Sequence, residues 1–186
     1  MSNYINPDKA RVWLDGDAFR APVGTALPSN MFAASLAGWS AFGGIKAGFN
    51  VTRARDTTDI NVWNNRTGTP YKRRKGDIAT TIAFRPVDYS VATVLTLLRG
   101  GSVSAAAGGF ELIEGDDETF AFIMRVVDGD DQKAFYVAKG ELLTLPEESM
   151  GAEDDVEGWD FEIGPLAPDD GSKGIRKFLN ENPLAA

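Results

Sequence analysis

The sequence of 186 residues contains no cysteine and no histidine. Without cysteine, the chain cannot form a disulfide, a thiolate nucleophile or a Cys-ligated zinc or iron–sulfur site. Without histidine, the Ser-His-Asp and Cys-His catalytic arrangements and the HExxH zinc site cannot be built. Chemistry would have to rest on carboxylates, Lys, Tyr or Ser, and no spacing of these residues singles out a catalytic pair. We therefore expect no enzymatic activity, no cofactor and no metal site.

Long apolar runs are also lacking. No stretch approaches the roughly 18 apolar residues of a membrane span. The segment Met1–Pro7 has no basic region followed by an apolar run, as a secretory signal would. We expect a soluble protein that is made in a cytoplasm and has no membrane partner.

The composition is that of a globular protein, with 43% hydrophobic and 25% charged residues. The chain length suits one domain with long extensions. We expect a single β domain over residues 1–164, with an N-terminal arm, and a C-terminal arm over residues 165–186. A short apolar cluster in the C-terminal arm could dock as one helical turn, and its members are Ile175, Phe178 and Leu179.

Charges of one sign are scarce in two parts of the chain. Residues 46–99 carry ten Lys/Arg against four Asp/Glu, whereas residues 111–170 carry three against nineteen. A nucleic-acid-binding protein usually lacks so acidic a segment, because it would repel phosphate. Opposite charges on one chain favour self-association, since the basic surface of one copy can meet the acidic surface of the next. The alternative is that both segments are solvated faces of one sheet.

Alternation of core-facing and polar positions recurs along the chain, as expected for strands with one buried face. The core-facing positions are Ile45, Ala47, Phe49 and Val51; Ile78, Thr80, Ile82 and Phe84; Phe120, Phe122, Met124 and Val126; Phe135 and Val137; and Trp159, Phe161 and Ile163. Acidic turns at 114–118 and 128–131 separate a strand near 110–113, the run that begins at Phe120 and a strand at 133–139, which predicts an antiparallel meander over 109–139. Their spacing does not match an EF-hand loop, and turn chemistry explains the same residues. The residues thus predict a mainly β fold, built on an antiparallel sheet with extended loop and terminal arms.

One flanking α-helix is predicted at about residues 88–99. Asp88 or Ser90 can cap its start, and Gly100-Gly101 would end it. The segment Gly100–Gly109 (GGSVSAAAGG) is expected to be a flexible connector. The helical stripe expected to cover the sheet consists of Val91, Val94, Leu95 and Leu98.

A long polar and basic loop, residues 64–76, is predicted between two strand-like runs at 58–63 and 78–85. Loops of this length are uncommon in compact domains and are often functional. We predict that it contacts another subunit, with the acidic 111–170 segment of that copy as its partner; the alternative is a solvated hairpin tip. The predicted interface residues are Asn64, Arg66, Thr69, Tyr71, Lys72, Arg73, Arg74 and Lys75.

The order of several segments carries a family resemblance. A strand-like run at Arg11–Leu14 precedes the sequence APVGTALP at 21–28, and Gly38-Trp39 and FGGI at 42–45 follow. A Thr/Asp-rich stretch then ends at Trp63, and the loop, a Thr-containing strand at 77–85 and the helix come next. Over about residues 10–140 this order resembles tail tube (major tail) proteins of long-tailed bacteriophages, particularly those of actinobacterial hosts.

The resemblance implies an antiparallel β-sandwich or barrel with one flanking α-helix, in a structural virion protein. Six copies would join their sheets into a ring, and rings would stack into a hollow tail tube. DNA would pass through the lumen at ejection without sequence-specific binding. The implied partners are other copies of the chain, a tape-measure protein, tail assembly chaperones and a tail terminator, with assembly in the host cytoplasm.

Two other functions are compatible with the residues. A β-sandwich binding module could recognise glycan or nucleic acid through Trp39, Trp63, Tyr71 and Trp159 together with the basic loop. A hydrolase could use two of the many acidic residues as a carboxylate pair. The family resemblance favours a self-assembling structural protein over both. The residues alone would leave the structural protein and the binding module nearly equal.

Overall fold

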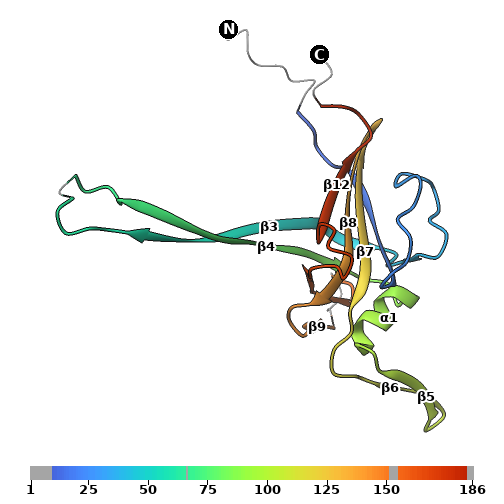
Figure 1. Ribbon diagram of the computed structural model, residues 1–186. Coiled ribbons are helices and arrows are strands. Elements are labelled where there is room, and N and C mark those ends of the chain that lie inside the picture. Colours follow the sequence, from blue (N-terminus) through green and yellow to red (C-terminus); the bar gives the residue numbers. More distant parts are fainter. Residues whose placement is uncertain (1–9, 66, 151–154, 184–186) are drawn as a thin grey trace.

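The computed structural model describes residues 10–65, 67–150 and 155–183. Within these ranges, no helix is long and apolar enough to cross a membrane. The elements in chain order are β1 (Asp15–Pro22), β2 (Ser40–Ala41), β3 (Ile45–Ile60), β4 (Lys72–Pro86), α1 (Val91–Leu98), β5 (Ser102–Ala106), β6 (Gly109–Ile113), β7 (Phe120–Asp128), β8 (Asp131–Leu142), β9 (Glu148–Ser149), β10 (Gly158–Trp159), β11 (Phe161–Pro165) and β12 (Ile175–Leu179) (Figure 1).

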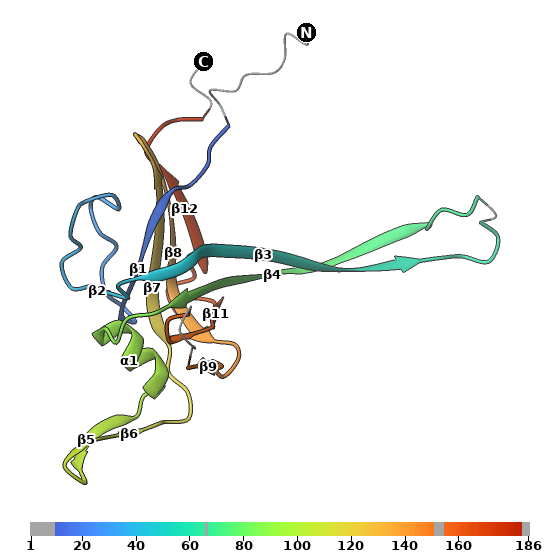
Figure 2. The same cartoon turned by 180° about the vertical axis from the view of Figure 1, so that it is seen from behind.

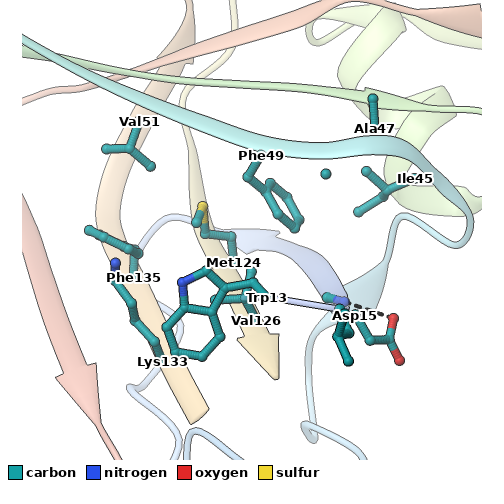
Figure 3. A pocket seen from close by; sticks show the side chains of 13 residues that line it. Trp13, Asp15, Ile45, Ala47, Phe49, Val51, Met124, Val126, Lys133 and Phe135 are labelled. Atoms are coloured by element: carbon teal, nitrogen blue, oxygen red, sulfur yellow. Dashed lines mark hydrogen bonds between the residues drawn. The ribbon is translucent and has the colours of Figure 1, made fainter. Parts of the chain in front are cut away.

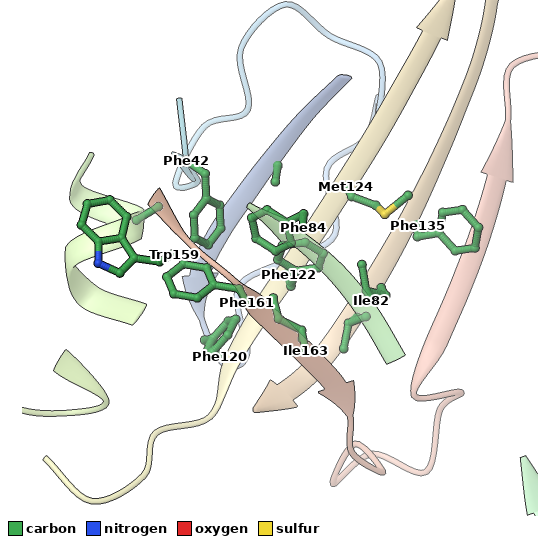
Figure 4. Close-up of a cluster of buried hydrophobic side chains, with 13 residues drawn as sticks. Phe42, Ile82, Phe84, Phe120, Phe122, Met124, Phe135, Trp159, Phe161 and Ile163 are labelled. Carbon is green, nitrogen blue, oxygen red and sulfur yellow. The ribbon is translucent and has the colours of Figure 1, made fainter. Parts of the chain in front are cut away.

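An eight-stranded antiparallel sheet forms the body of the protein. Its strands follow the order β2-β1-β7-β8-β11-β4-β3, and β12 also pairs with β8. β12 pairs with β8 residues 133–137, and β11 pairs with β8 residues 140–142. Through β11 the sheet turns back on itself, so that β4 and β11 cross over β7 and β8 (Figure 4). This sandwich-like arrangement confirms the predicted mainly β, antiparallel fold.

Aromatic side chains fill the space between the two layers. Phe84 of β4 lies 5.1 Å from Phe42, 5.4 Å from Phe122 and 5.8 Å from Phe161, measured between ring centroids. The rings meet mainly edge to face, which is a favoured geometry for aromatic pairs. Phe42, Phe122 and Phe161 are each less than 2% exposed. This cluster, drawn in Figure 4, holds β4 and β11 onto β7.

A second core covers the other face of β7. Ile123 packs there with Phe19, Met31, Trp39 and other side chains of β1, β8 and the loop over residues 23–39. Arg125 of β7 fastens this loop, because its guanidinium donates hydrogen bonds to Asp17, at 2.8 Å, and to the carbonyl of Ala33. β7 is therefore buried on both faces, which explains why its sequence FAFIMRV is nearly all apolar.

The helix α1 is capped as predicted, but its predicted buried stripe is only partly correct. The Ser90 side chain accepts a hydrogen bond from the Thr93 backbone N–H at 3.1 Å. Arg99 ends the helix in the left-handed region, at φ 47°. Of the predicted stripe, Leu98 is buried and Val94 half-buried, whereas Val91 and Leu95 are exposed. The other buried side chains are Ala92, Thr93 and Thr96. The prediction missed them because two threonine hydroxyls find hydrogen-bond partners inside, which a hydrophobic pattern cannot show.

One of these threonines, Thr96, accepts a hydrogen bond from a buried arginine. Arg20 of β1 is 4% exposed, and it donates hydrogen bonds to the Thr96 hydroxyl at 2.9 Å and to Glu118 at 2.5 Å. Its guanidinium also lies 4.3 Å from the centre of the Phe120 ring. Burial lowers the pKa of Arg20, and the bond to Glu118 opposes this shift. The arginine thus joins β1, α1 and the loop before β7.

The predicted meander over 109–139 is only partly correct. β7 and β8 form the expected hairpin, and its turn places Gly129 at φ 58°. β6, however, pairs with β5 in a separate two-stranded sheet, and the other neighbour of β7 is β1. The segment expected to be a flexible connector is therefore largely strand β5. Non-local pairing with β1 cannot be read from a run of local turns.

The two ends of the described chain also differ from expectation. The first strand is Asp15–Pro22 rather than Arg11–Leu14. Ile175, Phe178 and Leu179 belong to strand β12 rather than to a helical turn. Phe178 packs against the second core, and Ile175 packs against the first. β8 offers backbone hydrogen-bond partners to this segment, which favours a strand.

Burial along β4 predicts that two substitutions on the same strand face will destabilise the protein to very different extents. Phe84→Ala should lower the free energy of unfolding by about 3–5 kcal/mol, because it opens a cavity in the aromatic cluster. Ile78→Ala, six residues away where the side chain is 56% exposed, should cost less than about 1 kcal/mol. Urea denaturation of the unassembled chain measures both. Equal losses would show that the core extends along the whole strand.

Candidate subunit interface

The predicted contact loop lies at the end of a long β-hairpin. β3 and β4 leave the body together, and Figures 1 and 2 show them projecting far from the rest of the chain. Burial ends abruptly at Thr80, and every residue of β4 before it is exposed. We call residues 53–79 the arm. Its paired part, from Arg53 to Ile60, spans roughly 25 Å at about 3.3 Å per residue.

The arm is held by its own backbone pairing. The ladder runs from Arg53 opposite Thr80 to Ile60 opposite Lys72, with one irregularity between Arg55 and Thr57. At that irregularity, the Arg55 side chain donates a hydrogen bond to the Gly76 carbonyl at 2.9 Å. The hairpin is therefore continuous from the body to residue 60.

Asn65 closes the tip of the arm. Its side-chain oxygen accepts a hydrogen bond from the Thr67 hydroxyl at 2.7 Å, and its amide donates one to the Thr69 carbonyl at 2.9 Å. Gly68, at φ 72°, adopts the left-handed conformation that glycine accepts without strain. The predicted loop is thus shorter than expected, because β4 begins at Lys72 and residues 72–76 are strand.

The four consecutive cations do not share one environment. Arg73 donates two hydrogen bonds to Asp59 across the hairpin, at 2.5 and 3.0 Å. This hydrogen bonding holds the pKa of Asp59 below its ordinary value. Among the described residues, no carboxylate lies within ion-pair distance of Lys72, Arg74 or Lys75. The sequence prediction treated the four as equivalent, and Asp59 is the residue that it missed.

The arm also carries exposed aromatic residues. Trp63 is 92% exposed and Tyr71 is 70% exposed, at the two ends of the tip loop. Asn64 and Thr69 are exposed beside them, and Arg66 lies outside the described residues. The structure therefore gathers the described predicted interface residues on one projecting tip, together with Trp63.

An apolar groove of about 690 Å³ lies where β3 leaves the body. Its lining includes Trp13, Phe49, Val126 and Phe135, as Figure 3 shows. The Lys133 ammonium lies between two of these rings, 5.7 Å from the centre of Trp13 and 5.1 Å from that of Phe135. Burial and the nearby Lys177 and Arg53 charges lower the pKa of Lys133. The groove thus combines an apolar lining with a partly desolvated cation.

The four aromatics of the alternative binding module do not form one surface. Trp159 is 1% exposed in the core between the layers, and Trp39 is 9% exposed in the second core. Only Trp63 and Tyr71 of that set face solvent. A recognition platform made of all four is therefore absent from the described structure.

A sandwich with an exposed sheet edge at β3 and a charged projecting arm has the features of a protein built for assembly. The sequence agrees, because the family model for phage tail tube proteins matches residues 4–181. The chain belongs to this family of structural virion tail proteins, which assemble into a tube. A comparison with curated proteins gave no match.

The ion pair between Arg73 and Asp59 predicts that the pKa of Asp59 will respond differently to two substitutions in the arm. A depressed folded-state pKa means that Asp59 favours the hairpin above about pH 3.9, the ordinary value, and that this contribution is lost as the pH falls through the folded-state pKa. In Arg73→Ser the pKa of Asp59 should rise toward its ordinary value, whereas Arg74→Ser, on the opposite face, should leave it unchanged. Carboxyl NMR titration measures this. The same pKa in Arg73→Ser and in the parent chain would contradict the assignment.

Proposed function

We propose that this protein forms the tail tube as stacked hexameric rings through which DNA is ejected. The observation that carries the proposal is the arm, whose cations and aromatic tip extend beyond anything its own domain can cover. Family membership supports self-assembly into a tube. A projecting element of this kind suits contact between copies. Its exposed apolar and charged groups would gain partners at an interface with another copy.

Ring closure would use the edge of the sheet. β3 is the last strand in the pairing order and runs for 16 residues. Such an edge presents unpaired backbone N–H and C=O groups, and a closed ring would remove them from solvent. The arm would then act between copies, with Lys72, Arg74 and Lys75 facing the acidic 111–170 segment of a neighbour. Asn64, Arg66, Thr69, Tyr71 and Arg73 complete the proposed interface.

The remaining parts of the proposal follow the family resemblance. A tape-measure protein, tail assembly chaperones and a tail terminator would be the partners, and assembly would take place in the host cytoplasm. The segments 21–28 and 38–45 support an actinobacterial host. We propose no enzymatic activity, because the chain offers neither histidine nor cysteine. Residues 1–164 would act as the tube domain and residues 165–186 as a C-terminal extension of it.

The purified protein tests the tube directly. Negative-stain microscopy and sedimentation velocity over a concentration series should show a small species that becomes rings or tubes of fixed diameter. A chain that stays strictly monomeric at millimolar concentration, with and without a tail initiator, would overturn the proposal.

The unpaired cations of the arm give the corresponding mutational prediction. The triple change Lys72→Ser, Arg74→Ser and Lys75→Ser should slow or abolish tube formation and leave the thermal midpoint of the unassembled chain nearly unchanged. Exposed ion pairs are worth only about 0–1 kcal/mol each, but they repeat at every interface of a tube. Arg73 is kept, since it pairs within the arm.

A charge-conserving triple variant is the matched control. Lys72→Arg, Arg74→Lys and Lys75→Arg should assemble as the parent does, and added salt should weaken assembly of both. Normal tubes from the serine variant would show that these cations only solvate the hairpin. A much earlier unfolding midpoint would show that they belong to the domain's own fold.

A further inference from the structure

A second apolar groove lies at the other end of the molecule, between α1, the β5–β6 hairpin and the loop after β8. It has a volume of about 360 Å³, and its apolar lining includes Leu97, Leu112, Leu145 and Trp159. Leu112 is 47% exposed and Leu145 is 70% exposed. Figure 2 shows the β5–β6 hairpin extending below the helix, away from the sheet. We call this the α1–β6 groove.

One whole face of the β5–β6 hairpin continues the groove. Val103 lies opposite Leu112, and Ala105 lies opposite Phe110, so these four side chains share a face. Phe110 is 76% exposed. The other face carries Ser104 and Glu111, with Ile113 at the base of the hairpin. An isolated two-stranded hairpin is marginally stable in water, so an exposed apolar face on one indicates a surface that a partner covers.

The base of this hairpin is fixed to the helix. The N–H groups of Gly101 and Gly115 both donate to the Leu98 carbonyl, at 2.8 and 2.7 Å. A Cβ at Gly101 would lie 1.9 Å from the Ile113 carbonyl oxygen, so only glycine permits this approach. Arg99 adds hydrogen bonds to Glu114 at 2.6 Å and to the Asp116 carbonyl at 3.1 Å. The groove is therefore held in shape before any partner arrives, which lowers the entropy cost of binding.

The groove is bordered by acidic groups. Glu148 lines it directly, and two further lining residues, Glu114 and Arg99, form an ion pair with each other. Asp116 and Asp117 follow Glu114 along the chain. An apolar groove with an acidic border suits an aromatic segment flanked by unpaired cations.

The tip of the arm has this chemistry. Trp63 and Tyr71 are its exposed aromatics, and Lys72, Arg74 and Lys75 are its unpaired cations among the described residues. The arm of the same chain does not reach the groove, because its ladder is continuous and points away from α1 in both views (Figures 1 and 2). We infer that the α1–β6 groove receives the arm tip of a second copy of this chain. This inference rests on the proposed function of the arm and names its docking surface.

Disulfide trapping tests the assignment, because the chain has no cysteine of its own. The double variant Trp63→Cys, Leu112→Cys is assembled into tubes, oxidised mildly and run on a non-reducing gel. The two cysteines lie on different parts of the interface, so docking links copy after copy and gives a ladder of covalent multimers. Each single-cysteine variant can give at most dimers.

The matched control moves one cysteine by one residue. In Trp63→Cys, Glu111→Cys the second cysteine lies on the opposite face of the same hairpin. Species larger than dimers should be about tenfold or more abundant in the Leu112 variant than in this control, because a disulfide needs Cβ atoms within about 4.5 Å. If the Trp63 change prevents assembly, Thr69→Cys with Leu145→Cys replaces the pair and carries the same expectation.

The outcomes separate the two proposals. A ladder specific to the groove-facing pairs supports docking in the groove. Tubes that form without a ladder from either groove-facing pair overturn the groove assignment and leave the proposed function of the arm intact. A parent chain that forms no tubes overturns the proposed function itself.

Discussion

The packing of Phe84 against Phe42, Phe122 and Phe161 is the contact on which the rest of the molecule depends. It fixes β4 and β11 across β7, and so it creates the second layer of the sandwich. β4 then continues past Thr80 as one edge of the arm. The aromatic cluster anchors the part of β4 that lies in the body. It therefore fixes the base of the arm without contacting the arm itself.

β4 therefore passes from solvent into the core of the protein, and the change occurs at Thr80. From Thr80 onward, alternate side chains of β4 are buried, whereas Ile78 and the residues before it face water. The pairing with β3 continues through this change, so backbone hydrogen bonds carry the shape where packing stops. The charges of the arm also divide into two groups. Arg73 and Asp59 pair within the hairpin, whereas no carboxylate of the described residues lies within ion-pair distance of Lys72, Arg74 or Lys75.

Periodicity predicted the strands around Phe84 and Phe161, because one buried face leaves a clear alternation in the sequence. The strand around Phe122 was predicted from one apolar set alone, and its burial on both faces was missed. The Asp-Gly turn at 128–129 predicted the β7–β8 hairpin for a similar, local reason. Pairing between distant segments left no such trace: β1 lies beside β7, and β12 docks on β8 although β11 lies between them in the chain. The predicted loop does lie at the hairpin tip, although residues 72–76 belong to β4, and its contact with another subunit stays a prediction. Arg73 could be told from its neighbours only by the register that puts it opposite Asp59.

The docking of β12 also has a consequence for newly made chains. β12 pairs with residues 133–137 of β8, more than thirty residues earlier in the sequence. During translation, β8 leaves the ribosome first and can pair with β7 on one side, but the other edge of this stretch stays unpaired until β12 has followed. An open edge of this kind can recruit strands from other nascent chains. Once β12 has paired, it covers this edge, so a finished chain no longer presents this stretch of β8 to its neighbours.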